Sequence, residues 1–191
     1  MSAMATLPAL DPAYRKMTIQ EFLEADLGDA KAELVDGVIL MMTGGTHIHA
    51  AIAMNVAALL RARLRGTGCR PYGSDLAVQT GDFSLRFPDV SVYCGARPGD
   101  ASAKLLGDPV VLFEVLSPST AALDQRDKLP EYRALPGVQA IILIDPERQR
   151  CRLVERTGPE AWRDAWLPEG ADVSIAALEL SIPHAEIFAL D

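Results

Sequence analysis

Residues 109–116 read PVVLFEVL, an apolar run rich in β-branched residues that contains a single charged residue, Glu114. Such a run is typical of a central strand that is covered on both faces. Residues 138–145, VQAIILID, show the same pattern and end at Pro146. Together with the helical patterns around them, these strands predict a mixed β-sheet core flanked by helices, an α/β or α+β single domain.

The sequence on either side supplies further elements. Thr18 and Glu21 have capping-box spacing, which predicts a short N-terminal helix over residues 17–27. Asp36-Gly37 predicts the turn of a β-hairpin within residues 32–42, and residues 47–65 should form the longest helix. The remaining predicted elements are strands at 69–76, 76–80 and 86–93, a helix at 121–135 that breaks or restarts at Pro130, a hairpin of 151–155 with 161–166, and a C-terminal strand or helix with Ile187 and Phe188.

Length and composition limit the class of protein. The 191 residues suit one domain, which we place at 17–191 after an N-terminal extension at 1–16. No apolar run reaches the roughly 18 residues of a membrane span. The first residues also lack the basic start and long apolar block of a secretory signal. We therefore expect a soluble cytoplasmic protein with no membrane partner.

The three cysteines, Cys69, Cys94 and Cys151, are far apart in the sequence and form no CxxC pair. An odd, scattered set argues against both a disulfide framework and a zinc site. We expect them to be small buried hydrophobic residues in a reducing compartment.

The net charge of −8 is unfavourable for a nucleic-acid enzyme, because contacts with phosphates require Lys and Arg. Four arginines lie close together in the sequence, however: Arg61, Arg63, Arg65 and Arg70. They could form one basic face on an acidic protein. They could equally be the cations that are favoured at the C-terminal end of a helix.

Glu114 needs an explanation, because an ionised carboxylate in an apolar strand must be paired or bound to a metal unless it points into solvent. A second carboxylate, Asp89, follows Pro88 beside another β-like stretch, FPDVSVY. Two strand-borne carboxylates that meet across adjacent strands are a natural site for Mg²⁺, which prefers few carboxylates together with water and substrate phosphate.

Lys128 completes this set, 14 residues after Glu114. A lysine near the metal can hold the attacking nucleophile and offset charge in the transition state. The alternative is an ordinary surface lysine, paired with Asp124 one helical turn earlier.

Several short motifs then follow one another in order: ELVDG at 33–37, RFPDV at 86–90, EVLSPST at 114–120, Asp124 with Lys128 and Tyr132, PGV at 136–138 and IDP at 144–146. Over nearly the whole chain from about Met17, this resembles the Uma2 family of restriction-endonuclease-like proteins, within the PD-(D/E)xK nuclease superfamily. Each motif is weak by itself, but their common order and spacing are specific.

The resemblance implies a restriction-endonuclease-like fold and assigns roles to individual residues. Asp89 matches the Asp of the PD element, and Glu114 matches the acidic residue of the (D/E)xK element. Leu116 stands where the superfamily has its lysine, and Lys128 matches the lysine that this family has moved to the following helix. Glu33 is similar to the extra acidic residue of many such nucleases. The implied cofactor is Mg²⁺, with Mn²⁺ as a substitute, held by Asp89, Glu114 and the Val115 carbonyl.

His47 and His49 lie just after Gly44-Gly45, at the start of the long predicted helix. Residues separated by two positions do not share a helix face. We therefore interpret both as polar residues of the helix start, although residues of this type can approach a phosphate or a metal.

The sequence leads to one principal hypothesis, metal-dependent hydrolysis of nucleic-acid phosphodiester bonds, with DNA as the expected substrate. The competing hypothesis is a catalytically inactive binding or assembly protein on the same fold, which the acidic net charge favours. A nuclease that depends on a partner subunit would reconcile acidity with catalysis. A homodimer is compatible with either hypothesis.

Overall fold

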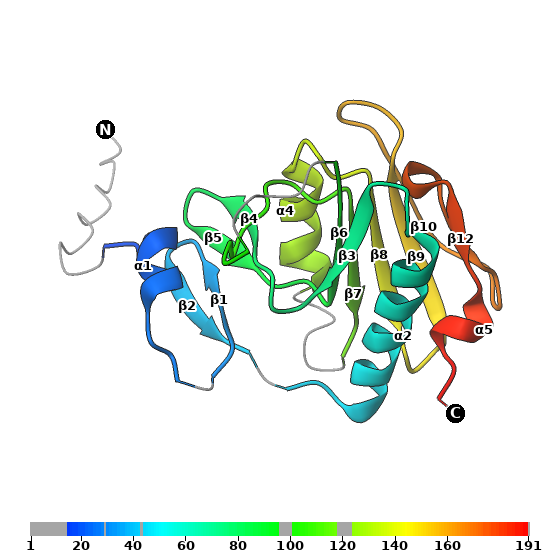
Figure 1. Ribbon diagram of the computed structural model, residues 1–191, viewed down its shortest axis with the longest axis horizontal. Coiled ribbons are helices and arrows are strands. Elements are labelled where there is room, and N and C mark those ends of the chain that lie inside the picture. Colours follow the sequence, from blue (N-terminus) through cyan, green and yellow to red (C-terminus); the bar gives the residue numbers. More distant parts are fainter. Residues whose placement is uncertain (1–14, 29, 43, 96–100, 118–123, 191) are drawn as a thin grey trace, which may run out of the picture.

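The central feature of the computed structural model is a six-stranded mixed sheet with the spatial order β10-β9-β8-β7-β6-β3 (Figure 1). The structure describes residues 15–28, 30–42, 44–95, 101–117 and 124–190. The strands are β3 (Cys69–Gly73), β6 (Val90–Cys94), β7 (Val111–Val115), β8 (Ala140–Asp145), β9 (Arg150–Arg156) and β10 (Trp162–Trp166). Only β7 and β8 pair in parallel, and these are the two strands predicted to be central.

Helices cover the two faces of this sheet (Figure 1). Val111, Phe113 and Val115 of β7 pack in the cluster that contains helix α2 (His47–Arg63). Leu112 belongs to a second cluster, with Leu129 of helix α4 (Leu129–Ala134). Because side chains alternate along a strand, Glu114 lies on the same face as Leu112 and therefore on the α4 side.

A second sheet has the order β2-β1-β5-β4 and lies beside the first (Figure 1). Its strands are β1 (Ala32–Val35), β2 (Val38–Met41), β4 (Val78–Gly81) and β5 (Ser84–Arg86). Helix α1 (Ile19–Glu24) packs on it through Phe22, which shares a cluster with Leu34 and Leu85. At its other end, β4 contacts α4, which covers one face of the central sheet.

The C-terminal segment completes the core on the α2 side. It comprises β11 (Val173–Ile175), the 3₁₀ turn η2 (Ala176–Leu178), β12 (Leu180–Ile182) and α5 (His184–Ile187). Both a strand and a helix form here, and Ile187 joins the cluster of α2.

Several local predictions are confirmed. Thr18 caps α1 in a capping box with Glu21, and β1 and β2 form a hairpin whose turn places Asp36 and Gly37 at positive φ. The segment before β8 contains the π-helical turn η1 (Asp124–Lys128), and α4 restarts there with Pro130 in its first turn. Residues 121–123 of the predicted helix, the Asp124 side chain and residues 1–14 of the predicted extension lie outside the described residues.

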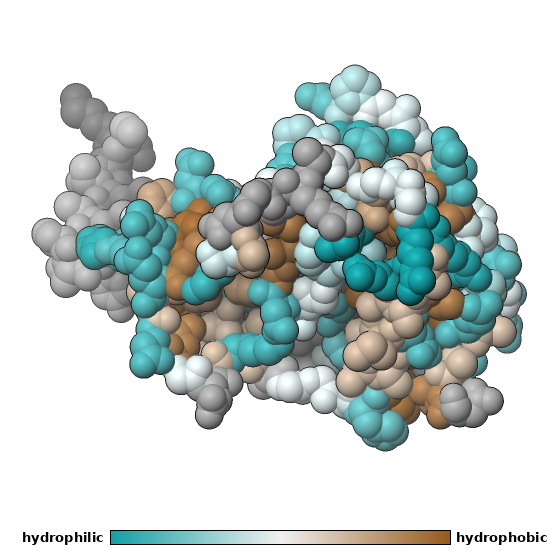
Figure 2. Space-filling model, in the orientation of Figure 1, coloured by the Kyte–Doolittle hydropathy of each residue, from teal (hydrophilic) through white to brown (hydrophobic). Residues whose placement is uncertain are grey.

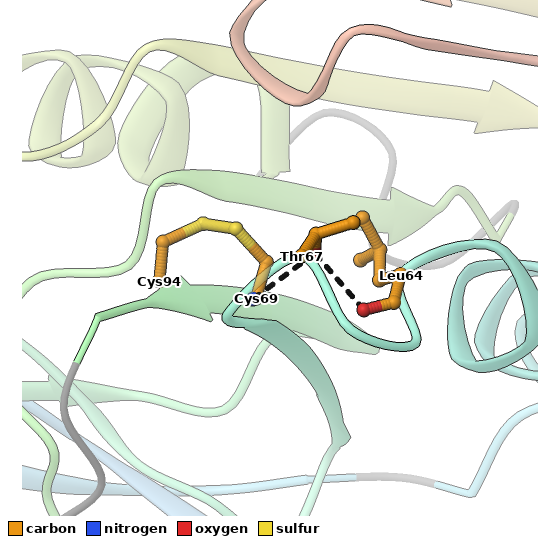
Figure 3. The surroundings of a disulfide bond; sticks show 4 residues. All are labelled: Leu64, Thr67, Cys69 and Cys94. Atoms are coloured by element: carbon orange, nitrogen blue, oxygen red, sulfur yellow. Dashed lines mark hydrogen bonds between the residues drawn. A yellow bond between two sulfur atoms is a disulfide. The ribbon is translucent and has the colours of Figure 1, made fainter.

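Two predictions are wrong. The strand expected over 86–93 is divided, because β5 ends at Arg86 and β6 begins at Val90 in another sheet. Pro88 lies between them and has no N–H to donate to a sheet. Cys69 and Cys94 are joined by a disulfide, with a Cα–Cα distance of 4.0 Å (Figure 3). Pairing of β3 with β6 places these two residues opposite each other.

Cys151, in contrast, is free and buried, as predicted for a small hydrophobic residue. Among the described residues, no helix is both long and apolar enough to cross a membrane.

Candidate active site

Glu114 is buried, with 4% of its surface exposed, and its carboxylate is paired inside the protein. Its Oε1 accepts a hydrogen bond of 2.6 Å from the Tyr132 hydroxyl and lies 3.3 Å from Lys128 Nζ. The alternative of a side chain that points into solvent is therefore excluded. Burial raises the pKa of Tyr132 well above 10, and the negative charge of Glu114 adds to this shift, so the hydroxyl remains a donor.

Lys128 is the last residue of η1 and is also buried, with 6% of its surface exposed. Its ammonium group lies between two carboxylates, 3.1 Å from Glu33 Oε1 and 3.3 Å from Glu114 Oε1. The π-helical turn is a form that recurs at functional sites, and it brings Lys128 to the face of the sheet where Glu114 lies. The alternative of a surface lysine is therefore also excluded.

Glu33, on β1, belongs to a buried ion network behind Lys128. Its Oε2 accepts a hydrogen bond of 2.9 Å from Arg86 Nη1, and Arg86 is completely buried. The remainder of the Arg86 guanidinium binds Glu131 through two parallel hydrogen bonds, Nε to Oε2 at 2.8 Å and Nη2 to Oε1 at 2.6 Å. Glu33 is thus engaged by two cations, Arg86 and Lys128.

Asp89 lies in the segment between β5 and β6, at the end of β7. Its Oδ2 accepts a hydrogen bond of 2.7 Å from the Val115 N–H and lies 3.2 Å from His49 Nε2. None of the described residues donates to Oδ1 of Asp89. The carboxylates of Asp89 and Glu114 therefore belong to one region, joined by the backbone of β7.

His49 reaches this site from the first turn of α2, where its N–H is capped by Thr46. The hydrogen bond to the Asp89 carboxylate raises the pKa of His49 above 6.5, and the charges of Asp89 and Glu114 act in the same direction, although burial opposes them. Sequence reasoning treated His49 as a polar helix-start residue. In the structure Gly45 lies against the His49 ring, where a Cβ would lie 2.8 Å from His49 Nδ1. The sequence alone does not show this contact.

One cleft of about 720 Å³ brings most of the predicted site together. Asp89, Glu114, Val115 and Lys128 all line it, and His49 lines the wall formed by α2. Glu33 does not line the cleft and contacts Lys128 from behind it. The structure thus separates Glu33 from the residues that a substrate could contact.

The donor set in the cleft fits a hard divalent cation. Within the described ranges, no group of three or more His, Cys, Asp and Glu side chains is arranged to hold a metal. The cleft offers the carboxylates of Asp89 and Glu114 and has space for water and phosphate, and Mg²⁺ commonly uses ligands of these kinds.

Comparisons with known proteins place this geometry in context. A family model described as "Uma2: Putative restriction endonuclease" matches residues 19–184. The uncharacterized protein slr1290 of Synechocystis sp. (strain PCC 6803) is 30% identical over 151 residues, which are 78% of this chain and 79% of that protein. The uncharacterized protein sll1609 of the same strain is 27% identical over 149 residues, or 76% of this chain and 84% of that protein.

A solved structure confirms the expected fold. The crystal structure from Anabaena variabilis ATCC 29413 that is described as a putative nuclease belonging to DUF820 has a TM-score of 0.75 to this chain. The match covers 90% of this chain and 97% of the other, at 21% identity. At this identity the likeness establishes a shared mixed α+β fold.

Proposed function

Because the chain belongs to the Uma2 family of restriction-endonuclease-like proteins, we propose that it is a metal-dependent endonuclease that hydrolyses phosphodiester bonds of DNA. The observation that carries this proposal is that Asp89, Glu114 and Lys128 line one cleft. A nuclease of this type needs anionic ligands for a cation and a positive charge beside the attacking group.

In this proposal, Asp89 and Glu114 hold Mg²⁺ or Mn²⁺ together with the Val115 carbonyl and water. When bound, the cation supplies Lewis acidity and stabilises the negative charge that develops on the phosphate. The Val115 N–H, which donates to Asp89 Oδ2, fixes one ligand, and the Tyr132 hydroxyl, which donates to Glu114 Oε1, fixes the other.

Lys128 has a separate role, which is to orient the attacking water through its ammonium group. Such a group needs a fixed position, because the rate depends on alignment of the reacting atoms. Glu33, held by Arg86 on its far side, provides that position. We therefore assign Glu33 as a positioning residue that acts through Lys128.

Nicking of supercoiled DNA tests the proposal. The wild type should nick in the presence of Mg²⁺ or Mn²⁺ and lose this activity with a chelator, and Glu114→Gln should lower the rate by about 100-fold or more. Glu160→Gln is the matched control, because Glu160 is an exposed carboxylate in the turn between β9 and β10. Nicking that persists in Glu114→Gln after the same purification would contradict the proposed site.

A second candidate is a non-catalytic binding or assembly protein on this fold, and the net charge of −8 favours it. Calorimetric titration with Mn²⁺ separates the two candidates. Metal binding that depends on Asp89 and Glu114, without cleavage of any DNA by the isolated chain, would favour the second one. Cleavage restored by an added subunit would instead identify a partner-dependent nuclease.

A further inference from the structure

A second hollow, of about 410 Å³, lies where the C-terminal end of α2 meets β3 and β6. Three arginines line it: Arg61, Arg65 and Arg70. Figure 2 shows strongly hydrophilic side chains gathered over this end of α2, whereas apolar side chains cover the middle of the helix. A concentration of positive charge at one place is unexpected on a protein with a net charge of −8.

None of these three arginines has an ion pair or hydrogen-bond partner within the described part of the chain. Other arginines are paired: Arg63, next to them in the sequence, lies 3.5 Å from Glu186 Oε1, and Arg152 is paired with Asp164. Favourable interaction with the C-terminal end of the helix accounts for a cation in the last turn of α2. It does not account for Arg70, which lies on β3.

The hollow also contains a carboxylate, Asp108, whose Oδ2 accepts a hydrogen bond of 3.1 Å from the Gly137 N–H. Three guanidinium groups and one carboxylate leave the described lining with an excess of positive charge. Gly66 and Gly68 form part of the wall, and a Cβ at either position would meet nothing within 4 Å. A bulky anion can therefore approach the backbone here.

The hollow and the catalytic cleft lie along the same two elements. Ala53, Ala57 and Arg61 follow one another at intervals of four residues and so share one face of α2. The two alanines line the cleft and Arg61 lines the hollow. On β3, Gly73 lines the cleft and Arg70 lines the hollow. The two sites are therefore neighbours along both α2 and β3.

We propose that this hollow is a phosphate-binding subsite for a DNA strand, in which Arg61, Arg65 and Arg70 hold backbone phosphates of the strand whose neighbouring nucleotides occupy the cleft. The guanidinium group suits this role, because its planar donors match phosphate oxygens in pairs. The inference rests on the proposed function in one respect, that the ligand is DNA.

The separation of the two sites fits such a strand. His49 in the cleft and Arg61 in the hollow are twelve positions apart in the sequence, or about 18 Å at a helix rise of 1.5 Å per residue. At about 3.4 Å per nucleotide along one strand, this spans about five nucleotides. The hollow would thus hold DNA away from the scissile bond without taking part in the chemistry.

Binding of a short fluorescein-labelled duplex to the full chain, measured by anisotropy over a salt series with EDTA present, tests the inference. The triple variant Arg61→Gln/Arg65→Gln/Arg70→Gln should lose about 10-fold or more in affinity at low salt. The slope of log K against log salt concentration should become smaller in magnitude by about 2 to 3. The double variant Arg61→Gln/Arg65→Gln, which alters only exposed side chains, should show an intermediate loss and guards against misfolding of the triple.

The matched control is Arg15→Gln/Arg148→Gln/Arg163→Gln. It removes the same amount of charge at exposed arginines outside the hollow, each of which is paired with a carboxylate. This control should bind within about 3-fold of the wild type, since the replaced arginines lie outside the hollow and would contact none of the phosphates bound there. An equal loss in both triple variants, no loss in the first, or no binding by the wild type would each overturn the inference.

Two further readouts complete the test. Inorganic phosphate and a mononucleotide serve as competitors. If either displaces the duplex more effectively than simple salt does, the hollow is a small-anion site and the assignment to a strand is wrong. If DNA binding depends on the three arginines but the protein cleaves no DNA, the proposed function is contradicted and the inference about the hollow stands. If the protein cleaves DNA with Mg²⁺ but its DNA affinity does not depend on the three arginines, only the inference about the hollow is contradicted.

Discussion

Lys128 Nζ lies 3.1 Å from Glu33 Oε1, so that a lysine from the turn before α4 is paired with a carboxylate of the neighbouring four-stranded sheet. The same ammonium group lies 3.3 Å from Glu114 Oε1 on the central sheet. One buried cation therefore connects the two sheets at the candidate active site. Because removal of one partner leaves the others buried without compensation, such groups depend on one another.

Replacement of Lys128 by methionine should affect both stability and activity. It leaves Glu33 and Glu114 buried without their shared cation, so we expect a loss of about 3 kcal/mol in the free energy of unfolding, measured with urea. Nicking should fall to background. Lys104→Met, at a lysine whose ammonium binds the Leu23 carbonyl, is the control and should change stability by less than about 1 kcal/mol.

The substitution Lys128→Arg separates the effect of the positive charge from the effect of its exact position. It keeps the positive charge, so most of the stability should return, but a guanidinium cannot occupy the same point and the rate should remain at least about 10-fold low. If the wild type nicks DNA and Lys128→Met nicks it at the same rate, Lys128 has no part in the mechanism.

Arg86→Lys tests the network behind the lysine. Arg86 makes three hydrogen bonds to two carboxylates from a fully buried position, and a lysine ammonium cannot reproduce the bidentate pair with Glu131. We expect a loss of about 3 kcal/mol in urea unfolding. Arg163→Lys, at an exposed pair with Glu155, should cost less than about 1 kcal/mol. Equal effects at the two positions would show that the buried network contributes nothing special.

Local sequence patterns were sufficient to predict the central strands and the importance of the residues on them. The run at 109–116 is apolar enough to require burial, and a carboxylate within it must find a partner or a metal. The capping box at Thr18 and the turn at Asp36-Gly37 are likewise encoded in adjacent residues. The assignment of Lys128 to the site rested on the resemblance to a family, because a lysine within a predicted helix carries no local signal of function.

The features that sequence reasoning missed all depend on contacts between distant segments. Cys69 and Cys94 become neighbours only through the register of β3 on β6. Arg86 was placed at the start of a strand, and nothing near it in the sequence shows that it is enclosed by Glu33 and Glu131. His49 reaches Asp89 because α2 begins at the end of β7, which no local pattern specifies.

Tyr132→Phe tests how Glu114 is held. The substitution removes a buried 2.6 Å hydrogen bond to a carboxylate, which contributes about 1.5–3 kcal/mol, so stability should fall by this amount. We expect kcat to fall about 10-fold with KM little changed, because the hydroxyl orients a proposed ligand and does not contact DNA. Tyr93→Phe is a matched control, since its buried hydroxyl binds no carboxylate among the described residues. Its stability should be unchanged or higher, and a loss as large as that of Tyr132→Phe would contradict this explanation.

Reduction of the Cys69–Cys94 disulfide should lower stability while the fold is retained. The bond closes a segment with a sequence separation of 25, and loop-closure entropy for this length corresponds to about 3.5 kcal/mol. The measurement is urea unfolding with and without dithiothreitol, repeated with Cys69→Ser/Cys94→Ser. The double variant should match the reduced wild type and should not respond to dithiothreitol. Identical unfolding midpoints under both conditions would show that the bond does not form in solution.

Cys151 should be unreactive in the native protein, and this can be measured by thiol titration with a chromogenic disulfide. Burial raises the pKa of Cys151 to about 12, so at pH 8 only about one thiol in 10⁴ is ionised, and the thiolate is the reactive form. Reactivity should increase as the pH rises toward this pKa. Unreduced protein should show no fast thiol when native and one when unfolded in denaturant, and all three cysteines should titrate after reduction and unfolding. Rapid labelling of one thiol at pH 8 in the native state would mean that Cys151 is accessible. Labelling of three thiols in the unreduced, unfolded protein would mean that Cys69 and Cys94 are not joined.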